Sequence, residues 1–143
     1  MKQWLLPIAA ALALPAQAQV EKTEEGAQAF LAQKLNRSRI LQFPTVFGDG
    51  SYTGYWSEAK SLGEWRRTGR CQTKLVNQTD IDWSHSTRLA ADPENFDLEV
   101  RDRLVSYRVR FNLKQLDSAD RQRIIAALTY LLDVCDTSRA TGF

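Results

Sequence analysis

The feature that most limits how this chain can fold is its pair of cysteines, Cys71 and Cys135. Cys135 lies in an apolar stripe typical of a helix, whereas Cys71 lies in a segment, residues 70–77, typical of a strand. A disulfide between them would join helix to sheet and stabilise the fold by about 4 kcal/mol in the chain-entropy model. Disulfides persist in the oxidising compartments that exported proteins reach, so we predict the disulfide if the protein is exported. The alternative is two buried free thiols.

The first residues indicate export. Lys2 is followed by a mostly apolar run, Leu5–Leu14, and by the small-residue pattern Ala16-Gln17-Ala18. This arrangement is typical of a cleavable signal peptide, and the run is shorter than the roughly 20 residues that a membrane span needs. We therefore expect residues 1–18 to be a signal peptide and residues 19–143 a single exported α+β domain, in the periplasm or the medium. The competing interpretation is a buried N-terminal helix.

Charge and composition narrow the class of protein. The formal net charge is only +2, so the chain is not a default nucleic-acid binder. The apolar fraction of 43% and the charged fraction of 25% are ordinary for one globular domain. No second apolar stretch is long enough to form a transmembrane segment. We expect no nucleic-acid partner, and the sequence does not set the oligomeric state.

Hydrophobic periodicity predicts helices at both ends of the domain. Residues 23–36 and 119–136 have apolar stripes at helical spacing, with Thr23 and Ser118 as the expected N-caps. Between them, strands are expected at residues 70–77, 81–84, 96–100 and 104–113 and on both sides of the turn Gly48-Asp49-Gly50, whereas residues 86–95 are expected to be mostly loop. This order predicts an α+β fold: an antiparallel sheet flanked by an N-terminal helix and a long C-terminal amphipathic helix.

The segment "TDIDWSH", residues 79–85, holds the only histidine of the chain. Ser84 and His85 are adjacent, so we expect their side chains to point apart rather than form a nucleophile–base pair. An alternating strand with Ile81 and Trp83 turned inward explains the segment without chemistry. We expect no catalytic residue; the competing hypothesis is a hydrolase that uses His85 with an acid such as Asp80 or Asp82.

No cofactor or metal site is expected. Zinc needs three or four Cys or His ligands, and the chain has one histidine and a cysteine pair expected to be oxidised. The glycines of "GDGSYTG" lack the Lys-Ser/Thr pair of a phosphate-binding loop, and turns explain them.

An interaction surface is the main functional expectation. Its candidate residues are aromatic or arginine, the side chains that protein interfaces favour: Tyr52, Tyr55, Trp56, Trp65, Arg66, Arg67, Arg108 and Arg110. The alternatives are that the aromatic residues fill the core of a small domain and that the arginines form a solvated, charge-balanced face.

We therefore expect a small exported, non-catalytic binding protein, such as an inhibitor or immunity protein that blocks a partner in the cell envelope. The alternative is a small-ligand or lipid-binding module, with an apolar pocket where helices close the end of a curved sheet. The hydrolase is the third hypothesis.

Overall fold

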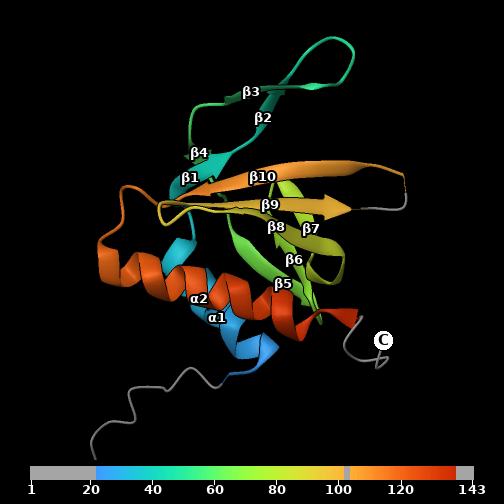
Figure 1. Cartoon of the computed structure of the whole chain (residues 1–143). Coiled ribbons are helices and arrows are strands. Elements are labelled where there is room, and N and C mark those ends of the chain that lie inside the picture. Colours follow the sequence, from blue (N-terminus) through green and yellow to red (C-terminus); the bar gives the residue numbers. More distant parts are fainter. Residues whose placement is uncertain (1–21, 102–103, 138–143) are drawn as a thin grey trace, which may run out of the picture.

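The computed structural model describes residues 22–101 and 104–137. The expected signal peptide, residues 1–18, lies outside these residues. The chain forms an α+β body with antiparallel sheets, as the order of elements predicts (Figure 1). In chain order the elements are α1 (Glu24–Leu35), β1 (Arg39–Gln42), β2 (Pro44–Val46), β3 (Tyr52–Trp56), β4 (Lys60–Ser61), β5 (Trp65–Gly69), β6 (Gln72–Leu75), β7 (Thr79–Asp82), the 3-10 helix η1 (Trp83–His85), β8 (Ser86–Ala91), β9 (Asn95–Arg101), β10 (Ser106–Asn112) and α2 (Ser118–Val134).

The largest sheet has five antiparallel strands in the order β4-β1-β10-β9-β8. Its centre is the β9–β10 pair, in which Leu98 lies opposite Val109 and Phe96 lies opposite Phe111, all four buried. Even-numbered residues of β9 therefore pair with odd-numbered residues of β10. The apolar residues are even-numbered within residues 96–100 and odd-numbered within residues 104–113, and this register brings both sets to the same face of the sheet.

A second sheet, β5-β6-β7, lies beside α1, and α1 and α2 pack against each other (Figure 1). Ile81 and Trp83 are buried here, as the alternation of residues 79–85 predicts. The buried ring of Trp65 on β5 stacks on Trp83 with a centroid distance of 6.0 Å. Large aromatic side chains thus join this sheet to the core under the helices.

Three expectations about local structure are wrong. Residues 86–95 contain β8 rather than mostly loop, because Ser86–Ala91 pairs with β9 as a polar edge strand without a strong apolar pattern. Cys71 lies in the turn between β5 and β6 rather than on a strand. The N-cap of α2 is Asp117, whose carboxylate accepts from the backbone N–H of Asp120, so Ser118 is already helical.

The disulfide between Cys71 and Cys135 is formed, with the two Cα atoms 5.7 Å apart. It joins the β5–β6 turn to the C-cap of α2, and the two cysteines are 64 residues apart in the sequence. Cys71 has a φ of 60°, in the left-handed region where a non-glycine residue costs about 1–3 kcal/mol unless its surroundings hold it.

The backbone of Cys71 is held on both sides. Its N–H donates to Glu24 Oε1 at 2.7 Å, and its carbonyl accepts from the N–H of Trp83 at 2.9 Å. Glu24 is only 7% exposed and also accepts from Arg67 at 2.8 Å and from Gln28 Nε2 at 2.6 Å. Hydrogen bonds from three partners therefore satisfy a carboxylate that burial would otherwise destabilise.

Gln28 extends this network into the core. Its Oε1 accepts from the Thr73 hydroxyl at 2.5 Å and from the Trp65 indole at 3.3 Å. The Trp83 indole donates in turn to Thr73 Oγ1 at 2.8 Å. Both buried indole N–H groups thus have partners, and α1 is joined to β5, β6 and η1 by side-chain hydrogen bonds.

The Glu24 network predicts a pH dependence of stability. Burial alone would raise the pKa of Glu24, but hydrogen bonds from Arg67, Cys71 and Gln28 lower it below its ordinary value. A lowered folded-state pKa stabilises the fold above the unfolded-state value of about 4.3, and this contribution disappears as the pH falls through the lowered pKa. We expect the free energy of unfolding to decrease between about pH 5 and pH 3, and to decrease less in Glu24→Gln.

Urea denaturation across this pH range measures the effect. Glu24→Gln should also lower the free energy of unfolding at pH 7 by about 1–3 kcal/mol, because charged hydrogen bonds are lost. The exposed neighbour Glu25 supplies the control, since Glu25→Gln should keep the wild-type acid profile. An unchanged profile in Glu24→Gln would show that this carboxylate does not stabilise the fold.

Candidate functional site: the projecting hairpin

The β2–β3 hairpin stands away from the rest of the structure (Figure 1). None of the residues in its two strands is buried. Its exposed fractions are 55% for Val46, 59% for Phe47, 38% for Tyr52 and 76% for Tyr55. Large apolar side chains are normally covered, so their concentration on one hairpin indicates a contact surface.

The β9–β10 turn adds two further exposed apolar side chains, Leu104 and Val105. Six of the seven exposed large apolar residues in the described part of the chain thus lie on these two hairpins, and only Leu89 lies elsewhere. Apolar exposure is therefore localised rather than scattered over the molecule.

The tip of the β2–β3 hairpin has a defined turn. Asp49 Oδ1 accepts from the Ser51 backbone N–H at 3.0 Å and from the Ser51 hydroxyl at 2.7 Å. These bonds lower the pKa of the exposed Asp49 carboxyl. Gly50 has a φ of 85°, which favours glycine at this position. The turn thus places the exposed Phe47 two residues before Asp49, in a loop closed by hydrogen bonds.

Two arginines of β10 support the hairpin from below. The guanidinium carbon of Arg108 lies 4.3 Å from the ring centroid of Tyr52, and that of Arg110 lies 4.2 Å from the ring centroid of Trp56. Each contact has the geometry of a cation–π interaction, worth about 0.5–2 kcal/mol. The hairpin is therefore held on the sheet mainly by these two stacked pairs and by its base.

Acidic residues of β9 neutralise the same arginines. Arg110 donates two hydrogen bonds to Asp97, at 2.7 and 2.8 Å, and these raise the pKa of the guanidinium. Arg108 Nε lies 3.6 Å from Glu99, which is its cross-strand neighbour. The same order occurs twice: an acid of β9 contacts an arginine of β10, and that arginine stacks on an aromatic ring of β3. Arg108 and Arg110 therefore position the hairpin rather than form a free basic surface.

The other predicted surface residues are not in this cluster. Trp65 is only 3% exposed and belongs to the core, so its placement on an interaction surface is wrong. Arg67 pairs with the buried Glu24 at 2.8 Å, and Arg66 pairs with the exposed Glu64 at 3.1 Å. Both arginines lie on β5, in a different sheet from β10, so no continuous basic stripe forms. The structure brings together Tyr52, Trp56, Arg108 and Arg110, with Tyr55 exposed on the same hairpin.

Val46, Phe47, Leu104 and Val105 were not among the predicted surface residues, although all four are exposed. The sequence contains one signal for the first pair, because Val46-Phe47 directly precedes the turn Gly48-Asp49-Gly50. An apolar pair at the tip of a hairpin has no second layer to bury it. The signal for the second pair is weaker, since residues 104–113 form a continuous alternating run.

The expectation that Ser84 and His85 point apart is wrong, because the 3-10 turn η1 replaces the extended strand. His85 Nδ1 lies 2.9 Å from Asp82 Oδ2 and 3.2 Å from Ser84 Oγ. Ser84 Oγ also donates to Asp82 Oδ1 at 2.5 Å. Serine and aspartate thus share one imidazole nitrogen, whereas a catalytic triad places them on opposite nitrogens.

Asp82 also has a structural role in this turn. Its side chain accepts from the Ser84 N–H as the N-cap of η1, at 3.0 Å. Burial would raise the pKa of Asp82, but the hydrogen bonds from Ser84 and His85 lower it. Asp80, Asp82 and His85 line an open cavity of about 700 Å³ beside Arg101 and Tyr107. Asp82 thus caps the η1 turn and contacts His85 at the edge of this cavity.

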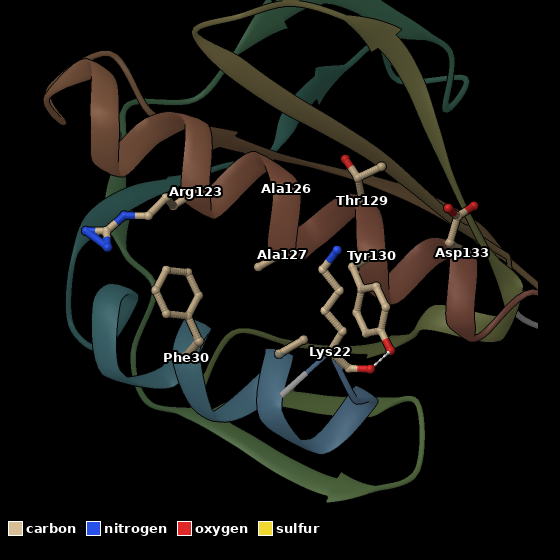
Figure 2. A pocket seen from close by; sticks show the side chains of 9 residues that line it. Lys22, Phe30, Arg123, Ala126, Ala127, Thr129, Tyr130 and Asp133 are labelled. Carbon is tan, nitrogen blue, oxygen red and sulfur yellow. Dashed lines mark hydrogen bonds between the residues drawn. The ribbon is translucent and has the colours of Figure 1, made fainter. Parts of the chain in front are cut away.

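A separate apolar groove of about 570 Å³ lies between α1 and α2 (Figure 2). Its lining residues are mostly apolar or small: Lys22, Ala27, Phe30, Arg123, Ala126, Ala127, Thr129, Tyr130 and Asp133. The sequence predicted a pocket where helices close the end of a sheet, whereas this groove is formed by the two helices themselves.

Neither described helix combines the length and the apolar composition that are needed to cross a bilayer. Within residues 22–101 and 104–137, no three His, Cys, Asp or Glu side chains gather closely enough to hold a metal ion. The chain matches no protein-family model, and no curated protein or solved structure is significantly similar to it.

The acid–arginine–aromatic arrangement predicts that Arg110 cannot be replaced by lysine without loss. Arg110→Lys keeps the charge but loses the two-point contact with Asp97 and the flat face against Trp56. We expect the free energy of unfolding to fall by about 1–2 kcal/mol, measured by urea denaturation at pH 7. Arg66→Lys, at an exposed ion pair, should change it by less than about 0.5 kcal/mol. Equal effects of the two substitutions would contradict the supporting role of Arg110.

Proposed function

We propose that the protein is a small exported, non-catalytic binding protein of the inhibitor or immunity type, which engages a protein in the cell envelope through the β2–β3 hairpin. The observation that carries this proposal is the concentration of exposed apolar side chains on the β2–β3 and β9–β10 hairpins. Because the hairpin extends from a domain with a disulfide, little conformational entropy would be lost when these residues bind a partner.

Two features support a binding role. Phe47 and Tyr55 are exposed by more than half, and aromatic residues of this kind dominate binding energy at interfaces. The disulfide between Cys71 and Cys135 is compatible with an oxidising compartment, which agrees with the signal-peptide pattern of residues 1–18.

The other hypotheses have weaker support. A hydrolase that uses His85 with Asp82 has the expected contact between Asp82 and His85 Nδ1, but Ser84 contacts the same nitrogen and is therefore not placed as its nucleophile. A ligand-binding module has one specific observation in its favour, the groove between α1 and α2, and that groove does not involve the hairpin.

Capture of a partner tests the proposal. The mature, oxidised protein is immobilised and an envelope extract of the source organism is passed over it, followed by a wash at moderate salt. We expect one protein to be retained near one-to-one stoichiometry. Phe47→Ser and Tyr55→Ser should each reduce its affinity about tenfold or more, as for interface hot spots.

The matched control is Leu89→Ser, which removes an exposed apolar side chain outside the two hairpins. This variant should capture the partner like the wild type. All three variants should keep the melting temperature of the wild type, because each side chain is at least 40% exposed. Undiminished capture by Phe47→Ser and Tyr55→Ser would exclude the hairpin as the contact surface.

A further inference from the structure

The groove between α1 and α2 offers a second site, which is independent of the hairpin. The two helices lie on the opposite side of the large sheet from β2 and β3 in Figure 1. The groove volume of about 570 Å³ lies within the range of roughly 300–1,000 Å³ that is typical of small-molecule sites.

The walls of the groove are apolar. Phe30 of α1 and Tyr130 of α2 supply aromatic rings, and Ala126 and Ala127 supply only methyl groups (Figure 2). The short alanine side chains leave the space between the rings open. An elongated apolar chain would therefore find contacts along the groove without displacing any core side chain.

Most polar groups at the groove already have partners. The Tyr130 hydroxyl donates to the carbonyl oxygen of Lys22, and the Thr129 hydroxyl donates to the carbonyl oxygen of Ile125 at 2.7 Å. Arg123, at the Phe30 end, pairs with Asp120 at 3.3 Å. These hydroxyl protons are thus not available to bind a ligand.

Lys22 is the exception. Its side chain extends across the groove toward α2 in Figure 2, and within the described part of the chain its ammonium has no ion-pair or hydrogen-bond partner. A cation beside an apolar groove complements a molecule with an apolar chain and one anionic head group. The groove also has one carboxylate in its lining, Asp133, but Asp133 already has a partner, so the groove favours an anionic over a cationic amphiphile.

We propose that this groove binds the apolar chain of a monomeric anionic amphiphile, such as a fatty acid, with Lys22 pairing with its head group. The ligand lies between Phe30 and Tyr130, and its carboxylate or phosphate faces the ammonium. The groove takes one amphiphile molecule rather than a membrane surface.

Calorimetric titration of the mature, oxidised protein tests the proposal, with decanoate and decyltrimethylammonium as probes below their micelle concentrations. We expect decanoate to bind at one-to-one stoichiometry. Lys22→Glu should weaken decanoate about three- to tenfold and should not weaken decyltrimethylammonium, because it reverses one exposed charge pair. Ala126→Trp should abolish decanoate binding by filling the groove.

The control is Ala90→Trp, which adds the same side chain at an exposed position on β8 and should bind decanoate like the wild type. Equal affinity for the two probes, or decanoate binding that survives Ala126→Trp, would overturn the proposal. The absence of decanoate binding would also overturn the proposal. If the protein then floated with phosphatidylglycerol vesicles, the groove would be a membrane contact instead.

Discussion

The architecture depends on how Cys71 is held. This residue occupies a left-handed backbone position in the β5–β6 turn, with a disulfide to the end of α2 and a hydrogen bond from its N–H to the buried carboxylate of Glu24. Helix α1, helix α2 and the second sheet therefore meet at one residue. A left-handed turn residue needs surrounding contacts to hold it, and a buried carboxylate needs hydrogen-bond donors. The bond from the Cys71 N–H to Glu24 meets both needs.

This constraint explains the division of the molecule into a fixed body and a projecting hairpin. The disulfide, the Glu24 network and the aromatic core fix the helices and two sheets, whereas the β2–β3 hairpin has no buried strand residue. The hairpin is positioned instead by Arg108 and Arg110, whose charges are compensated by β9. Its exposed side chains are thus available for contact without being needed for folding.

Hydrophobic periodicity predicted the helices and strands that bury a continuous apolar face. It did not predict elements and contacts that are set by pairing with residues distant in sequence. The two helices, the β9–β10 hairpin and the disulfide follow from apolar spacing and the cysteine count. Strand β8 was missed because its edge position leaves a polar sequence. The places of Trp65 and Arg67 were also missed, because their partners Trp83 and Glu24 are distant in sequence.

The candidate site was predictable in part. The turn Gly48-Asp49-Gly50 located the hairpin, whereas the pairing of Arg108 with Glu99 and of Arg110 with Asp97 depends on a strand register that the sequence pattern does not set. The contacts of His85 depend on a 3-10 turn, and the groove depends on how two helices pack against each other. Neither feature has a signature in local sequence, because both arise from tertiary packing.

Native-state hydrogen exchange read by mass spectrometry distinguishes a fixed body from a separately held hairpin. We expect the amides of β2 and β3 to exchange through local opening, whereas those of β6, β9 and β10 should exchange only at the free energy of global unfolding. Arg110→Lys should speed exchange in the hairpin more than in β6. If β2 and β3 were as protected as β9, the hairpin would be an integral part of the core, and the division into a fixed body and a projecting hairpin would be wrong.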